Sequence, residues 1–124
     1  MRRFEITRKF LNAEIITQVL CLGDGIHVSV FGGTRPHIGA VSIVSPDGMV
    51  ETTQFPGHKD GVVSARWAEA LSEAGVYPCV VEVGIHYDDL IGQEIGQIIF
   101  LTAEMLSTML ADLSVTSSDV SVNR

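Results

Sequence analysis

Three short polar clusters in this 124-residue chain combine glycine, histidine and charged residues in patterns that suit ligand binding. They occupy residues 32–39, 56–60 and 84–89, and they contain three of the four histidines. Imidazole and carboxylate groups bind divalent metals, whereas cationic side chains and backbone N–H groups bind phosphate. The cluster sequences are Gly-Gly-Thr-Arg-Pro-His-Ile-Gly, Pro-Gly-His-Lys-Asp and Gly-Ile-His-Tyr-Asp-Asp.

The first cluster begins with a glycine pair, Gly32 and Gly33, followed by Arg35 and His37. Paired glycines let backbone N–H groups approach a phosphate closely, and the Arg35 guanidinium offers a fork of donors for an anion. Gly39 removes a side chain beside His37 and would open the sheet face there. The alternative is an ordinary glycine-rich connection between strands with a surface arginine.

The second cluster, with His58, Lys59 and Asp60, lies at the start of a predicted helix. Helix N-termini attract anions through their unpaired N–H groups and partial positive charge, and Lys59 would strengthen that preference. The alternative is that His58 and Asp60 only help to begin the helix.

The third cluster places His86 and Asp88 two residues apart at the end of a predicted strand. A histidine and an aspartate at this spacing could bind a metal ion or direct a proton. Many purely structural strands also end in aspartate, so a structural role is the alternative here.

If the clusters converge, His37, His58 and His86 would share one site. Arg35 and Lys59 would then bind an anionic group, and the imidazoles with Asp60 and Asp88 would hold a divalent cation. No strong nucleophile has an adjacent base in the sequence, and the cysteines, Cys21 and Cys79, lie in strand-like runs typical of buried thiols. The pattern favours binding over turnover, for example of a phosphorylated cofactor through a metal bridge; scattered structural histidines are the alternative.

Strands and helices that could position these clusters follow from the hydrophobic periodicity. Alternation with period two over most of the first half predicts strands, and a period of 3.6 predicts helices. The predicted strands cover residues 4–10, 13–22, 26–31, 37–44, 49–55 and 79–87, and the predicted helices cover residues 59–74 and 92–113. We expect a single α+β domain over residues 1–114, with a mainly antiparallel sheet of about six strands, two helices packed on it, and a flexible tail over residues 115–124.

Each helix shows an apolar stripe that should face the sheet. On the first helix the stripe is followed by Gly75, which we expect at the C′ position. The first stripe comprises Val63, Trp67, Ala70, Leu71 and Ala74, and the second comprises Ile95, Ile98, Ile99, Met105, Leu106, Met109 and Leu113.

The composition narrows the classes of protein that this chain can belong to. Hydrophobic residues make up 46% of the chain and charged residues 19%, which excludes intrinsic disorder. Because the apolar runs are interrupted well before about 18 residues, we expect no membrane span. Fifteen acidic residues against eight Lys and Arg disfavour nucleic acid as a partner. With no apolar leader before the first strand, we expect a cytoplasmic protein.

Taken together and in this order, the clusters resemble the LpdD-like prenylated-flavin chaperones, which are similar to bacterial proteasome-assembly-chaperone-like domains. The resemblance runs over residues 26–110 and rests on Gly-Gly followed by Pro-His-Ile-Gly-Ala-Val, on Gly-His-Lys-Asp and on Gly-Ile-His-Tyr-Asp. It implies an α+β homodimer that carries prenylated FMN to a UbiD-like aromatic-acid decarboxylase as its accessory subunit. By position, it implies that Gly32, Gly33, Arg35, His37, Gly39, His58, Lys59 and His86 line the cofactor, with Asp60 and Asp88 beside it or on a metal.

Two other functions remain compatible with the sequence. One is a protein-assembly chaperone or scaffold without a small-molecule ligand, which would need none of the histidines. The other is a small metal-dependent enzyme, such as a hydrolase or isomerase, that uses the same imidazoles and loses activity on chelation.

Overall fold

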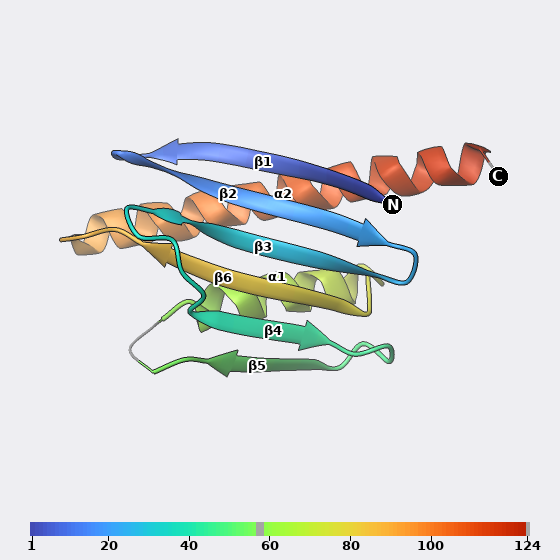
Figure 1. Ribbon diagram of the computed structural model, residues 1–124, viewed down its shortest axis with the longest axis horizontal. Helices are drawn as coiled ribbons and strands as arrows, with labels where there is room; N and C mark the ends of the chain where they lie inside the picture. Colours follow the sequence, from blue (N-terminus) through green and yellow to red (C-terminus); the bar gives the residue numbers. More distant parts are fainter. Residues whose placement is uncertain (57–58, 124) are drawn as a thin grey trace.

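The computed structural model describes residues 1–56 and 59–123, with side chains described as far as residue 114. It contains a six-stranded sheet and two helices (Figure 1). The elements are β1 (Arg2–Phe10), β2 (Ala13–Leu22), β3 (Gly25–Gly33), β4 (Ala40–Val44), β5 (Val50–Gln54), α1 (Gly61–Glu73), β6 (Cys79–His86) and α2 (Gly92–Asn123). The predicted α+β single domain is confirmed.

The strands lie in the order β1-β2-β3-β6-β4-β5. β3 and β6 are parallel, and the other four neighbouring pairs are antiparallel, as the sequence predicted for a largely antiparallel sheet. The last strand in the sequence is therefore inserted between β3 and β4. The connection from β3 to β4 must cross the end of β6, and this crossing positions the site described below.

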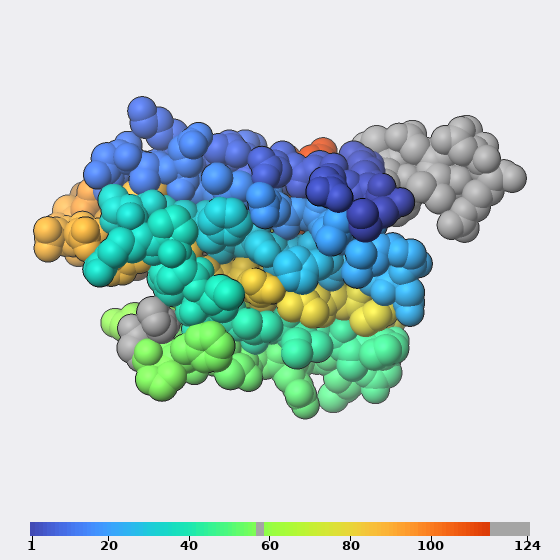
Figure 2. All heavy atoms as spheres, viewed as in Figure 1, coloured from blue at the N-terminus to red at the C-terminus, as the bar shows by residue number. Residues whose placement is uncertain are grey.

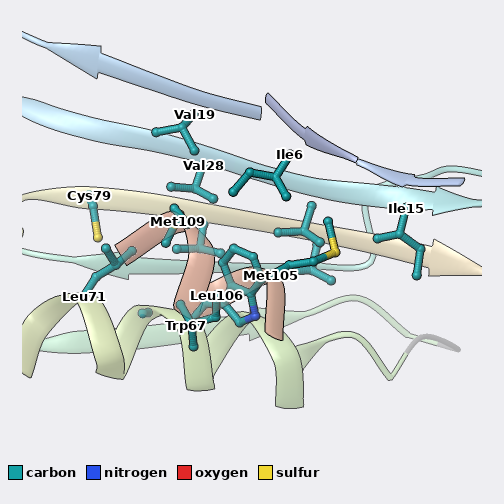
Figure 3. Packing of buried hydrophobic residues seen from close by; sticks show 14 of the residues in the cluster. Ile6, Ile15, Val19, Val28, Trp67, Leu71, Cys79, Met105, Leu106 and Met109 are labelled. Atoms are coloured by element: carbon teal, nitrogen blue, oxygen red, sulfur yellow. The ribbon is translucent and has the colours of Figure 1, made fainter. Parts of the chain in front are cut away.

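Both helices lie behind the sheet in the view of Figure 1, and the hydrophobic core lies between them and this covered face. Trp67 and Leu71 of α1 and Met105 and Met109 of α2 are fully buried there, against valines of the central strands (Figure 3). Replacing a side chain such as Trp67 by alanine typically costs about 3–5 kcal/mol of stability. The opposite face of the sheet, called the open face below, has no helix across it (Figure 2).

Helix α1 ends as expected. Gly75 has a φ of +76° and donates its N–H to Ser72, while the N–H of Val76 returns to the carbonyl of Leu71. This pair of hydrogen bonds is a Schellman motif, in which glycine adopts the left-handed conformation without strain. The helix begins two residues later than expected, at Gly61, and Ala74 of the expected stripe is exposed.

Helix α2 differs from the prediction in two ways. It runs Gly92–Asn123, past Leu113, because the Ser/Thr/Val-rich segment contains no glycine or proline to end it; the flexibility of residues 115–124 stays a prediction. Ile95 and Ile99 are 48% and 37% exposed, so assigning them to the core was wrong. Ile98, which lies between them along the chain, is 9% exposed and does belong to the core.

By length and composition alone, Gly92–Ser114 of α2 could cross a membrane. This corrects our expectation that no segment could, because single glycines and glutamates interrupt the apolar runs without lowering their mean hydropathy enough. Core helices pass the same test, and Met105 and Met109 of this helix are buried against the sheet. That no membrane binds the protein stays a prediction.

The two cysteines are free thiols. Cys79 is buried in β6, and burial raises the pKa of its thiol to about 11. Burial also raises the pKa of Cys21, which is partly exposed. Because the thiolate is the reactive form, Cys79 is a poor nucleophile at neutral pH.

Thr17 on β2 provides a test of the core. Its side chain is fully buried, and its hydroxyl has no hydrogen-bond partner among the described residues. Because a buried hydroxyl without a partner carries a desolvation cost, Thr17→Val should raise the free energy of unfolding by about 1 kcal/mol. Urea denaturation measures this, with Thr7→Val on the exposed side of β1 as the neutral control; a destabilised Thr17→Val protein would contradict this account of the core.

Candidate functional site

The candidate site forms where the β3–β4 connection crosses the carboxyl end of β6, at the left edge of the sheet in Figure 1. Gly39 donates its N–H to the carbonyl of Val83 at 2.9 Å, and Thr34 donates to the carbonyl of His86 at 2.8 Å. The segment between β3 and β4 is thus hydrogen-bonded to β6 on both sides of His37. Carboxyl ends of parallel strands whose connections diverge are common ligand sites in α/β proteins.

Asp60, just before α1, joins this crossing to the helix. Its Oδ1 accepts the backbone N–H of Ile85 at 3.1 Å, and its Oδ2 lies 3.1 Å from Nε2 of His37. Asp60 occupies the N-cap position of α1, but its side chain does not cap the helix. Instead, Gln54 accepts the N–H of Gly61 at 2.9 Å, which leaves the carboxylate of Asp60 to hold the site together.

His37 is bonded on both sides of its ring. Nδ1 lies 3.1 Å from the carbonyl oxygen of Arg35, and Nε2 faces the carboxylate of Asp60. The two contacts, with the carbonyl oxygen and the carboxylate, hold the imidazole ring in one orientation. The His37 and Asp60 side chains are only 23% and 11% exposed, and this pair is the least exposed ion pair found among the described residues.

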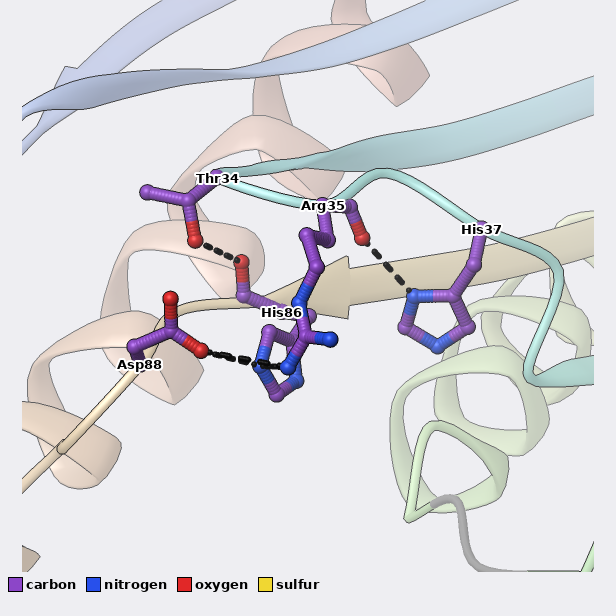
Figure 4. Close-up of polar contacts among 5 residues, drawn as sticks. All are labelled: Thr34, Arg35, His37, His86 and Asp88. Carbon is purple, nitrogen blue, oxygen red and sulfur yellow. Dashed lines mark hydrogen bonds and ion pairs between the residues drawn. The ribbon is translucent and has the colours of Figure 1, made fainter.

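A second polar group, composed of Arg35, His86 and Asp88, lies beside the first (Figure 4). Nη2 of Arg35 is 2.8 Å from Nε2 of His86 and 3.2 Å from Oδ1 of Asp88, and that imidazole nitrogen is 3.0 Å from the same oxygen. The hydrogen bond from His86, assisted by the positive charge of Arg35, lowers the pKa of Asp88. These side chains are exposed, so solvent screens their attraction.

A cavity of about 450 Å³ opens beside these groups, between the start of α1, the end of β6 and the first turns of α2. This volume lies within the range of about 300–1,000 Å³ typical of small-molecule sites. Four polar residues line one part of it: His37, Lys59, Asp60 and His86. The remaining lining is aliphatic: Val62, Val63, Ile85, Leu90, Ile95, Ile98 and Ile99.

The structure brings together most of the predicted site residues. The ring centroids of His37 and His86 lie 6.4 Å apart, and both residues line the cavity with Lys59 and Asp60. Arg35 is not part of the cavity lining, although it contacts His86. His58 lies outside the described residues.

The glycines have a structural role that the sequence analysis did not predict. A Cβ at Gly32 or Gly33 would collide with the chain's own backbone, at Glu14 and His86 respectively. A Cβ at Gly39 would collide with Asp60 and press on His37. The packing of the chain therefore requires glycine at these three positions, and their part in binding a cofactor stays a prediction.

Metal binding was predicted for His37, His58, His86, Asp60 and Asp88. Among the side chains that the structure describes, in residues 1–56 and 59–114, no group of three or more His, Cys, Asp or Glu could hold a metal ion. The histidines form two separate pairs instead, His37 with Asp60 and His86 with Asp88. A metal site that includes His58 stays a prediction.

The aliphatic wall of the cavity was missed by the sequence analysis. Ile95 and Ile99 were assigned to the core, because periodicity marks the apolar side of a helix but does not show whether another element covers it. Val62 precedes Val63 of the predicted stripe, and this pair of adjacent valines was the available signal that α1 has a second apolar surface.

The fold has a counterpart among solved structures. The chain is similar to a structure described as a novel chaperone complex for yeast 20S proteasome assembly, with a TM-score of 0.57 and 15% identity. The likeness covers 91% of this chain and 99% of that chain, and at this identity it shows the fold alone. The chain is thus an α+β domain that shares its fold with a protein of an assembly-chaperone complex.

Sequence comparison identifies the family to which the chain belongs. Residues 9–114 match the family described as the prenylated flavin chaperone LpdD-like domain, and the chain belongs to this family. Protein LpdD of Lactiplantibacillus plantarum is 30% identical over 101 residues, which cover 77% of this chain and 73% of that protein. The resemblance inferred from the three clusters is therefore confirmed. Membership in the family supports a chaperone role and implies a partner protein.

Gly39 allows a direct test of the site geometry. In Gly39→Ala the new methyl group should displace the carboxylate of Asp60 and the ring of His37, lowering the free energy of unfolding by about 1–3 kcal/mol. The matched control is Gly23→Ala, because a Cβ at Gly23 meets nothing within 4 Å. Equal stabilities of the two variants in urea denaturation would contradict the close packing around Asp60.

Proposed function

We propose that this protein binds a phosphorylated flavin, prenylated FMN, in the cavity between α1, α2 and the end of β6. In this proposal the protein carries the cofactor to a UbiD-like aromatic-acid decarboxylase and acts as its maturation chaperone or small accessory subunit. The observation that carries the proposal is the two-part lining of one cavity, polar on one side and aliphatic on the other. Family membership supports the choice of a prenylated flavin.

The polar side suits a phosphate group. Lys59 is exposed, lines the cavity and lies next to the start of α1, where the helix dipole adds positive potential. His37 and His86 line the same cavity, and the carboxylate of Asp60 is in contact with His37. An arginine is close by, since Arg35 is bonded to His86.

The aliphatic side suits a flat ring system with an apolar substituent. Ile95 and Ile99 of α2 face Val62 and Val63 of α1 across the cavity. Branched aliphatic side chains present a broad surface for an isoalloxazine ring, whose burial is favoured by about 25 cal/mol per Å² of apolar area.

The carrier role is favoured over an enzyme by the position of the possible nucleophiles. The described lining of the cavity contains no hydroxyl or thiol side chain, and the thiol of Cys79 has a pKa of about 11. A cofactor carrier needs recognition without covalent chemistry. The free thiols are also compatible with a reducing compartment, and we propose the cytoplasm.

Titration with FMN and with prenylated FMN tests the binding proposal by isothermal calorimetry. We expect one ligand per chain, and Lys59→Ala should weaken binding by about tenfold because a charge-assisted hydrogen bond to phosphate is lost. The titration is repeated with EDTA, and an unchanged affinity would show that the side chains bind the flavin without a metal ion.

The matched control for Lys59 is Arg66→Ala, which removes an exposed cation of the same helix region that does not line the cavity. It should bind as tightly as the unchanged protein. Absence of heat with both flavins would refute the cofactor proposal and leave the assembly scaffold, which needs no small molecule. Loss of binding in EDTA would show that a metal ion bridges the phosphate.

We also infer that the protein is a homodimer formed through the open face. Hydrophobic residues occupy positions where a sheet facing water would carry polar ones. Ile43 is 49% exposed there, and Val80 and Phe31 lie in the central strands on the same face. Two such faces can stack about 10 Å apart, and the cavity, which opens among the helices, stays accessible.

The homodimer predicts a mass in solution twice that of the 13.4 kDa chain. Ile43→Lys places an ammonium group in the apolar contact and should convert the dimer to monomer in multi-angle light scattering. Met49→Lys, in the exposed β4–β5 turn, is the control and should remain dimeric. A monomeric unchanged protein would contradict the role assigned to the open face.

A further inference from the structure

Arg35, His86 and Asp88 form a group of contacts that no protonation state satisfies completely. Nη2 of Arg35 lies 2.8 Å from Nε2 of His86, and both nitrogens lie within 3.2 Å of the same oxygen, Oδ1 of Asp88 (Figure 4). If Nε2 donates a proton to Asp88, it also faces an N–H donor of Arg35 at 2.8 Å, with no acceptor between the two nitrogens. If Nε2 carries no proton, its lone pair lies 3.0 Å from the carboxylate oxygen. One of the three contacts is therefore unfavourable in either case.

The carboxylate of Asp88 is the less firmly held of the two carboxylates in the site. Asp60 accepts the backbone N–H of Ile85, and its side chain is 11% exposed. The side chain of Asp88 is 59% exposed, and its hydrogen bonds among the described residues come from the side chains of Arg35 and His86. Exposed ion pairs contribute little, because water screens the charges and both side chains lose freedom. Separating Arg35 from Asp88 therefore costs little.

The side chain of Arg35 is the part of this group that can move most freely. Asp88 follows Tyr87, which is buried in the core and anchors the backbone beside the carboxylate. The guanidinium of Arg35 ends a long side chain that is 70% exposed. It contacts His86, which lines the cavity with Lys59. Rotation about the side-chain bonds of Arg35 can therefore direct its positive charge toward an anion bound beside His86.

We propose that Asp88 competes with the phosphate group of the bound cofactor for Arg35. This inference rests on the proposed function, and in it Asp88 lowers the affinity for a phosphorylated ligand. A phosphate group offers several acceptor oxygens and a larger negative charge than one carboxylate. When Arg35 turns to the phosphate, Asp88 keeps its contact with His86, and the unfavourable third contact is removed. A carrier benefits because the carboxylate can bind Arg35 again when the cofactor is passed on.

Calorimetric titration of the full chain with FMN and with riboflavin, which lacks the phosphate, tests this competition. Asp88→Asn keeps the size of the side chain and removes its charge. It should tighten FMN binding by about two- to fivefold, the range expected for an exposed ion pair, and should leave the affinity for riboflavin unchanged.

The matched control is Asp89→Asn, which removes the same charge from the neighbouring residue. Asp89 is exposed and, among the described residues, forms no hydrogen bond or ion pair with Arg35 or His86. Asparagine tolerates the φ of 57° at this position. This variant should bind FMN as tightly as the unchanged protein.

A double-mutant comparison shows whether Asp88 acts through Arg35. In the Arg35→Ala protein, Asp88→Asn should no longer change the FMN affinity, because the cation for which the two anions compete is absent. A gain that persists there, an equal gain in Asp89→Asn or with riboflavin, or no gain in Asp88→Asn would overturn the competition while the carrier function stands. If the unchanged protein binds neither FMN nor riboflavin, the proposed function fails and this inference fails with it.

Discussion

The carboxylate of Asp60 holds the site together. It accepts the backbone N–H of Ile85 with one oxygen and faces the imidazole of His37 with the other, so it ties the start of α1 to β6 and to the β3–β4 connection. These segments are far apart in the sequence, and backbone hydrogen bonds from Gly39 to Val83 and from Thr34 to His86 also join two of them. Because the pair is largely shielded from water, removing either partner would leave a polar group poorly satisfied.

The position of these contacts of Asp60 follows from the strand order. Since β6 lies between β3 and β4, the connection between those strands must cross it, and His37 passes directly over Gly84, where a Cβ would collide with the carbonyl of His37. The crossing leaves a cavity on the helical side of the sheet and apolar residues on the open face. In the function proposed above, the cavity would bind the cofactor and the open face would bind a second copy of the chain, so the two contacts would lie on different sides of the sheet.

The sequence predicted where the strands and helices lie better than it predicted which of their side chains are buried. Alternation and the Gly75 stop located the strands and α1 well, because these signals depend on local backbone preferences. The sequence analysis predicted that His37 and His86 lie close together, because each belongs to a short polar cluster. The structure places the centroids of their rings 6.4 Å apart. Periodicity did not show that Ile95 and Ile99 line a cavity, nor that close contacts with Glu14, His86 and Asp60 require glycine at positions 32, 33 and 39. Those features depend on strand order, which local patterns do not encode.

The central claim is that His37 and His86 belong to one ligand site on the helical side of the sheet, whereas His27 is paired with Glu82 at 2.8 Å on the open face. Imidazole ¹H–¹⁵N NMR spectra, recorded while FMN is added, test it most directly. The account predicts that the signals of His37 and His86 shift together along one binding curve and that those of His27 stay in place. A shift confined to His27, or His37 and His86 responding with different affinities, would contradict it.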